Sequence, residues 1–270
     1  MILSDNQILE YNTKGYLILD DVYDKNLSLE FSNILASIIN SFNLEKIFIK
    51  DLDKLNHKDA IELVLKSLND LETLDHKYIK IIYDTIRNTD LLNRMTNSQK
   101  ILNTVSQLMG YENKIPLYVK QIACRIDMPQ NQTFSLDWHQ EAPYSIKGSD
   151  FIQLWAPAIN DVGKINGSIK VLEESNSAGV VETEDFIPKV GHAQYKPKQN
   201  VIDKFVEKQI ELKFGQVLLF SNTLIHKSGD NSSLLPRLTL LAHYHNPLNK
   251  NFLDAMGQKE TEPPSRNTYK

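Results

Sequence analysis

The spacing of apolar residues changes near the middle of the chain. Between about residues 25 and 110, apolar side chains recur every three or four positions, as in 29–39 and 61–68, which predicts several amphipathic helices. After Ile115-Pro116 short alternating or continuous apolar runs replace this period and predict strands. The predicted strands cover residues 117–125, 151–156, 168–172, 210–214, 217–220 and 238–244, with one earlier strand at 15–19.

The order of these elements predicts a helical first half followed by a β-rich second half. No stretch rich in Pro, Gly or Ser separates the halves, and no internal repeat is present. We therefore expect one domain over residues 1–270, mostly β, with residues 1–114 as a mainly helical buttress packed outside a β core of residues 115–250. Residues 257–270 contain Pro263-Pro264 and almost no apolar side chains, which predicts a polar tail that is mobile at its end.

Composition and charge exclude several classes of protein. The net charge of −4 offers no excess of basic residues for a nucleic-acid backbone or an acidic membrane surface. Cys124 is the only cysteine, so an intrachain disulfide and a thiolate-rich metal site are excluded. The sequence contains no signal peptide and no apolar run long enough to span a membrane. These features predict a soluble protein of the reducing cytoplasm that acts on a small-molecule substrate. They do not determine its oligomeric state.

One short stretch suggests metal chemistry. His139 and Glu141 lie two residues apart in a probable strand, where side chains at that spacing project from the same face. His226 follows a later apolar run and is the best candidate for a third ligand. Two histidines and one carboxylate on one side of a metal leave positions open for a cosubstrate and O2, as in non-heme Fe(II) oxygenases.

The stretch Trp138-His139-Gln140-Glu141 resembles the Trp-His-Gln-Asp of the phytanoyl-CoA dioxygenase family, whose members depend on Fe(II) and 2-oxoglutarate. Later stretches resemble the same family in the same order: Trp155 with residues 166–172, residues 214–220, His226-x-Ser228-x-x-Asn231, and Pro236-Arg237. The usual Pro-Gly-Ser-His after the second stretch is replaced by Glu173-Glu174-Ser175-Asn176.

The resemblance implies a double-stranded β-helix, a cupin-like jelly roll, with Fe(II) held by His139, Glu141 and His226. Arg237 lies eleven residues after His226 (237 − 226), the interval at which the family places the arginine that binds the far carboxylate of 2-oxoglutarate. The implied reaction consumes 2-oxoglutarate and O2, releases succinate and CO2, and hydroxylates a substrate.

Other residues are candidates around this centre. The resemblance implies that Gln121 contacts the cosubstrate, and the Ser228 hydroxyl is expected to add a hydrogen bond to it. Strand parity places Gln121 and Arg125 on one face. Arg125, Tyr144 and His243 are candidate substrate contacts, since His243 shares the parity of Arg237 on the last strand. The loops 144–150 and 179–200 are expected to cover the pocket. The substrate expected from the loop side chains is a small polar or anionic metabolite; these side chains are Lys189, His192, Tyr195 and Lys196.

Glu141 departs from the aspartate that is usual in the family, although a carboxylate of either length can reach a metal. A carboxylate at this position favours hydroxylation over halogenation, which would need a vacant site for a halide. Two alternatives remain open at this point. The first is a cupin-like metal-binding or sensing protein that oxidises no substrate, and the second is a structural jelly roll whose histidines are incidental.

Overall fold

A computed structural model describes residues 2–133, 135–146, 148–186 and 194–259. The first half is helical apart from strand β1, as the apolar spacing predicts. Its elements are α1 (Asp5–Lys14), β1 (Tyr16–Leu19), α2 (Lys25–Ser41), α3 (His57–Leu74), α4 (Lys77–Ile86), α5 (Asp90–Thr96) and α6 (Gln99–Leu108).

Side-chain caps set where these helices begin. The Asp24 carboxylate accepts from two backbone N–H groups of the first turn of α2, and the side chains of Asn56 and Thr89 do the same, once each, for α3 and α5. Each cap satisfies donors that have no partner inside the helix.

The second half consists of short strands. They are β2 (Tyr118–Asp127), β3 (Phe151–Pro157), β4 (Lys170–Leu172), β5 (Thr183–Phe186), β6 (Gln194–Pro197), β7 (Glu207–Gln209), β8 (Val217–Ser221), β9 (His226–Lys227) and β10 (Arg237–His245), with helices α7 (Gln199–Ile202) and α8 (Lys250–Lys259). Residues 210–214, predicted as a strand, form only a bridge between Leu212 and Val162. The chain turns there, because the Phe214 amide donates to the Asp161 side chain.

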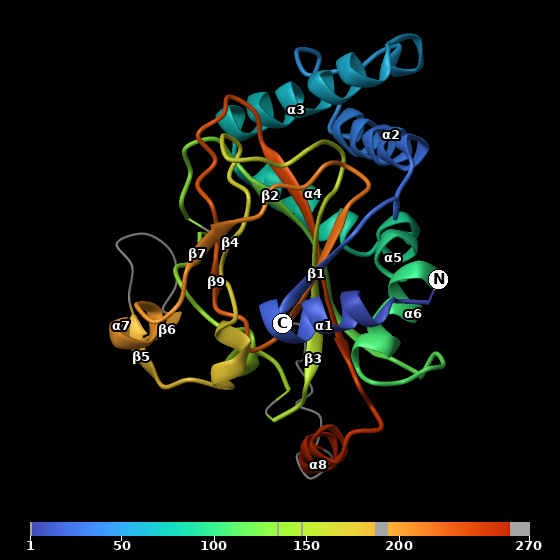
Figure 1. The fold of residues 1–270 in the computed structure, drawn as a ribbon. Helices are drawn as coiled ribbons and strands as arrows, with labels where there is room; N and C mark the ends of the chain where they lie inside the picture. The colour runs from blue at the N-terminus through green and yellow to red at the C-terminus, as the bar shows by residue number, and fades with distance from the viewer. Residues whose placement is uncertain (1, 134, 147, 187–193, 260–270) are drawn as a thin grey trace.

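Two antiparallel sheets form the core. One has five strands in the order β1-β8-β3-β10-β2, and the other has three in the order β7-β4-β9. Figure 1 shows the smaller sheet on one side of the larger one and the helices α4 to α6 on the other. This is the predicted jelly-roll core with helices packed outside it.

Strand β10 separates a helix-facing side from an inner side. Its even-numbered residues Leu238, Leu240 and Tyr244 belong to the hydrophobic core that also contains the helices. Its odd-numbered residues therefore face the space between the sheets. The core shared by helices and strands is the basis for proposing one domain over residues 1–270.

The last described element is helix α8, which continues to Lys259, into the first residues of the predicted polar tail. The remainder, residues 260–270, lies outside the described residues. Within the described ranges, none of the helices has the length and apolar character needed to cross a membrane.

Candidate metal centre

The backbone brings His139 and His226 together. Residues 138–141 do not form the expected strand; His139 makes one antiparallel bridge with His226 at the start of β9. Both backbone hydrogen bonds of this bridge are 3.0 Å long, and the two imidazole rings lie 4.2 Å apart. Glu141, two residues after His139, then reaches the same space.

The three side chains form a compact set of donor atoms. Oε1 of Glu141 lies 3.4 Å from Nε2 of His139 and 3.7 Å from Nε2 of His226. One ligand atom from each of the three residues lies within 4.8 Å of the other two. Among the described residues, this is the only group of three or more His, Cys, Asp or Glu side chains close enough to hold a metal ion.

Hydrogen bonds fix the orientation of both rings. Nδ1 of His139 donates to the backbone carbonyl of Asp137 at 2.7 Å, and Nδ1 of His226 donates to that of Leu224 at 3.0 Å. This assignment follows from the carbonyl acceptors and leaves both Nε2 lone pairs facing Glu141. Nε2 of His139 is buried with no hydrogen-bond partner in the described part of the chain. A buried acceptor of this kind needs a ligand, so the residues fit a divalent metal ion.

Electrostatics keep Glu141 and His226 in the form that binds metal. Burial alone would raise the pKa of Glu141, but its interactions with His139 and His226 outweigh burial and hold the pKa well below its usual value. Burial, followed by the neighbouring His139, lowers the pKa of His226. The site therefore holds a carboxylate beside a neutral His226 imidazole at neutral pH, and metal binding requires deprotonated donors.

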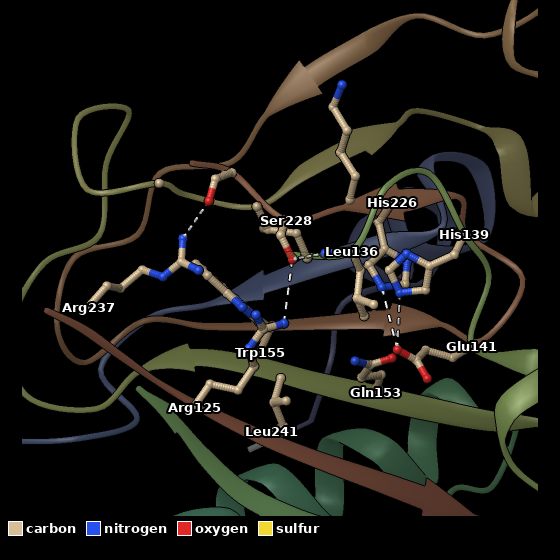
Figure 2. A pocket seen from close by; sticks show the side chains of 14 residues that line it. Arg125, Leu136, His139, Glu141, Gln153, Trp155, His226, Ser228, Arg237 and Leu241 are labelled. Atoms are coloured by element: carbon tan, nitrogen blue, oxygen red, sulfur yellow. Dashed lines mark hydrogen bonds and ion pairs between the residues drawn. The ribbon is translucent and has the colours of Figure 1, made fainter. Parts of the chain in front are cut away.

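Two arginines lie at the other end of the same cavity, which has a volume of about 60 Å³ (Figure 2). Arg237, only 3% exposed, donates to Asp127 at 2.7 Å and to the Gly229 carbonyl at 3.2 Å. Arg125 donates to the other oxygen of Asp127 at 2.7 Å and to the Ser228 hydroxyl at 3.4 Å. Two guanidinium groups and one carboxylate leave a net charge of +1 at this end.

The pairing with the arginines also fixes the charge of Asp127. Burial alone would raise its pKa, but Arg125 and Arg237 outweigh burial and hold the pKa below its usual value. Asp127 therefore stays ionised, and it aligns both guanidinium groups along β2 and β10.

Gly167 makes room for the arginine. A Cβ atom on Gly167 would lie 2.6 Å from Nη1 of Arg237 and 2.6 Å from the Gly229 carbonyl oxygen. The φ angle of Gly167 is +85°, which also belongs to the left-handed region that favours glycine. Asn166-Gly167 belongs to one of the stretches that resemble the phytanoyl-CoA dioxygenase family. This pair thus has a packing role beside Arg237.

Replacing Gly167 by alanine should destabilise the protein. We expect Gly167→Ala to lower the free energy of unfolding by at least about 1–2 kcal/mol, because the left-handed conformation and the close contacts both act against a Cβ. Gly110→Ala is the matched control, since Gly110 also has a φ of +85° but open space around its Cβ position. Urea denaturation compares the two; equal losses would show that the contacts with Arg237 and Gly229 add nothing.

The structure moves Gln121 out of the site. Strand β2 bulges where Ala123 pairs with Leu241 but Lys120 pairs with His243, and Gln121 sits in this bulge with a φ of +56°. The extra residue reverses the strand parity. Gln121 is exposed and does not line the cavity, whereas Lys120 lies on the inner face opposite His243.

The other predicted side chains lie close to the centre. Nε2 of His243 is 3.8 Å from Oε2 of Glu141, and burial lowers its pKa to about 4. Tyr144 ends the short 3-10 helix after Glu141, and its ring centroid is 6.1 Å from that of His139, outside the cavity lining. Its hydroxyl accepts from the Tyr195 amide at 2.7 Å. Arg125 and Ser228 thus line the cavity, His243 lies beside Glu141, and Tyr144 lies outside the cavity next to His139.

The segment 179–200, which was expected to cover the pocket, is described only in part. Of its expected pocket residues, Lys189 and His192 lie outside the described residues. Lys196 donates to the Asp137 carboxylate at 2.8 Å. The contacts of Tyr195 and Lys196 are therefore with the segment that carries the metal ligands.

Gln153 is a buried polar residue of the cavity that the sequence did not lead us to expect there. It lies in β3 between Ile152 and Leu154, is 4% exposed, and its buried Oε1 has no hydrogen-bond partner among the described residues. It lines the same cavity as Trp155, which shares its strand parity. A single polar residue in an otherwise apolar strand was the available signal, because an unpaired buried amide is unfavourable without a ligand.

Comparison with solved structures supports this fold. The epimerase SnoN, in complex with Fe3+, alpha ketoglutarate and nogalamycin RO, matches with a TM-score of 0.60 and 16% identity over 98% of this chain and 91% of its own. The non-heme monooxygenase ThoJ matches with a TM-score of 0.59 and 14% identity over 90% and 78%. EctD from S. alaskensis with bound Fe matches at 0.56 and 12% over 90% and 76%. No curated protein sequence matches significantly.

A jelly-roll core that brings together two histidines and one carboxylate is typical of non-heme metal oxygenases. The family model for phytanoyl-CoA dioxygenase (PhyH) matches residues 11–239. The chain therefore belongs to the phytanoyl-CoA dioxygenase family, whose members use Fe(II), 2-oxoglutarate and O2.

Proposed function

We propose that this protein is an Fe(II)- and 2-oxoglutarate-dependent hydroxylase of a small molecule. The observation that carries the proposal is a single cavity with metal donors at one end and paired guanidinium groups at the other. His139, Glu141 and His226 form the first end, and Arg125 and Arg237 form the second. A dicarboxylate with an adjacent keto group matches both ends at once.

His139, Glu141 and His226 would hold the iron. When bound, Fe(II) supplies the redox chemistry that couples the decarboxylation of 2-oxoglutarate to oxidation of a substrate. In the balanced reaction, a substrate C–H bond, O2 and 2-oxoglutarate give the alcohol, succinate and CO2. One oxygen atom of O2 enters succinate and the other enters the substrate.

The remaining residues orient the reactants. In this proposal the planar fork of Arg237 and the Ser228 hydroxyl hold the far carboxylate of 2-oxoglutarate, and Arg125 adds a second positive charge there. Gln153 offers an amide between the two ends of the cavity. The apolar walls of Leu136, Trp155 and Leu241 limit the water that reaches the reacting groups.

The first test is turnover of the cosubstrate. Protein loaded with Fe(II) under anaerobic conditions and then exposed to O2 should convert 2-oxoglutarate to equal amounts of succinate and CO2, slowly without substrate and faster with it. A metal-binding or sensing protein would bind 2-oxoglutarate without converting it. Absence of succinate from iron-loaded wild-type protein in the presence of a broad metabolite mixture would contradict the proposal.

Arg237→Ala should weaken 2-oxoglutarate far more than iron. The change removes a guanidinium that lies at the far end of the cavity, and it leaves all three donor residues in place. Loss of a charge-assisted bidentate pair corresponds to about 1.5–3 kcal/mol, or roughly 10- to 150-fold in affinity. Arg237→Lys should recover only part of this loss, since an ammonium cannot form the planar fork.

Isothermal titration with 2-oxoglutarate and Fe(II) separately measures both effects. Because Asp127 would lose one of its two partners, the thermal stability of each variant is the necessary control. An unchanged affinity for 2-oxoglutarate in a folded Arg237→Ala protein would exclude this role for Arg237.

A further inference from the structure

A second, larger cavity lies beside the metal centre, between helix α4 and the edge strand β2. Its volume is about 480 Å³. Five of its ten described lining residues have apolar or aromatic side chains, and these are Ile79, Tyr83, Ile126, Leu136 and Leu241. Protein interiors are normally close-packed, so an apolar space of this size suggests a ligand.

The two cavities share part of their walls. Arg125, Leu136 and Leu241 line both of them. Figure 2 shows these three side chains in the pocket that also holds His139, Glu141 and His226. A molecule in the α4 cavity therefore lies against three residues of the cavity that holds the metal donors, Arg125 of its guanidinium end among them.

The sizes of the cavities assign them different ligands. The cavity at the metal centre measures about 60 Å³, and one water position takes about 10–15 Å³ of such space. A metal ion and one small dicarboxylate use all of it. The α4 cavity falls in the range of about 300–1,000 Å³ that is typical of pockets for organic ligands.

Charges are found mainly at the mouth of the α4 cavity. His76, Lys80 and Asp84 are exposed on α4 and line the opening. Deeper in the cavity Asp127 is the only acid among the described lining residues, and Arg125 and Arg237 neutralise it. The deep part therefore favours an apolar group, because a polar group placed there without a partner is unfavourable.

We propose that the α4 cavity binds the substrate and that this substrate has a predominantly apolar, aliphatic or aromatic body. The inference rests on the proposed function and narrows it: the apolar body lies against Leu136 and Leu241, which also line the cavity that holds the metal donors, and any polar group lies at the mouth. This differs from the polar or anionic metabolite that the loop residues indicated. It also assigns specificity to Ile79 and Tyr83 of α4.

The first experiment measures binding alone, in metal-free protein. The probe is 8-anilinonaphthalene-1-sulfonate, an aromatic dye whose fluorescence rises in apolar sites. Tyr83→Trp fills part of the cavity and should weaken the dye at least tenfold, while 2-oxoglutarate binding to the iron-loaded protein stays unchanged. Ile81→Trp is the matched control, because Ile81 lies on the same helix, is 44% exposed and does not line the cavity.

A second variant tests the wall that the two cavities share. Leu136→Phe adds bulk where the two cavities share a wall, so it should weaken both the dye and 2-oxoglutarate. Equal dye affinity in wild type, Tyr83→Trp and Leu136→Phe would overturn the assignment of the cavity. No dye binding to the wild type would overturn it as well.

The second experiment tests the substrate class in iron-loaded protein. Two panels are compared for stimulation of succinate release: medium-chain alcohols and aromatic monocarboxylic acids in one, amino acids and sugars in the other. We expect stimulation of at least about tenfold from members of the first panel only, and loss of it in Tyr83→Trp. Stimulation by the second panel alone would overturn the inference. Dye binding without succinate release from any panel would instead contradict the proposed function.

Discussion

His139→Ala and His226→Ala should each remove most of the bound Fe(II). Each change leaves two of the three donor residues, which are too few to retain a labile divalent ion. Loss of a residue that merely supports a metal ligand already costs about 10–100-fold in affinity, so loss of a ligand itself should cost at least about 100-fold. Anaerobic titration of the metal-free proteins with Fe(II) measures the loss directly and does not depend on any substrate.

The comparison needs a histidine outside the centre. His57 begins helix α3, and its Nε2 lies 3.0 Å from the Ser28 hydroxyl. His57 is not among the three donor residues and does not line the cavity, so His57→Ala should bind Fe(II) as tightly as the wild type. Unchanged iron affinity in both His139→Ala and His226→Ala would show that the metal is held elsewhere.

Local spacing made much of the centre predictable. The two-residue interval between His139 and Glu141 places both side chains on one side of an extended chain whether or not a full strand forms. The interval from His226 to Arg237 spans a turn between β9 and β10, so Arg237 is the first residue of the returning strand. Both predictions depend on the number of residues between two nearby positions in the chain, and this number is read directly from the sequence.

Features that depend on irregular backbone were not predictable in this way. Strand parity places Gln121 with Arg125, but one bulge in β2 exchanges Gln121 for Lys120 on the inner face. A bulge leaves no reliable signal in an apolar pattern, because the residues on both sides still alternate. The resulting error concerns one residue, although it changes which side chain faces His243.

Contacts between distant segments were also hidden. Asp127 lies between Arg125 and Arg237, so the arginine expected to meet the cosubstrate already has a buried acidic partner. The wall that α4 gives to the larger cavity includes Ile79 and Tyr83, which lie 60 and 56 positions before His139 in the chain (139 − 79 and 139 − 83). The sequence shows an amphipathic helix there, and only packing decides whether its apolar face meets the core or a cavity.

Glu141→Asp and Glu141→Ala should have opposite outcomes. Aspartate keeps the negative charge and the donor oxygen and loses one C–C bond, about 1.5 Å of reach, so we expect it to retain measurable succinate release. Alanine removes the only carboxylate among the three donor residues. We expect it to weaken Fe(II) by at least about 100-fold and to abolish succinate release, with chloride restoring part of the iron affinity as a substitute anion.

Asp137 provides the matched acidic control for this prediction. It lies two residues before His139, but its carboxylate accepts from Lys196 and from the Trp138 amide, away from the donor cluster. The backbone carbonyl that orients His139 survives its replacement, so Asp137→Ala should keep the iron affinity of the wild type. Wild-type iron affinity and succinate release in Glu141→Ala, together with their loss in Asp137→Ala, would place the carboxylate ligand at residue 137 instead.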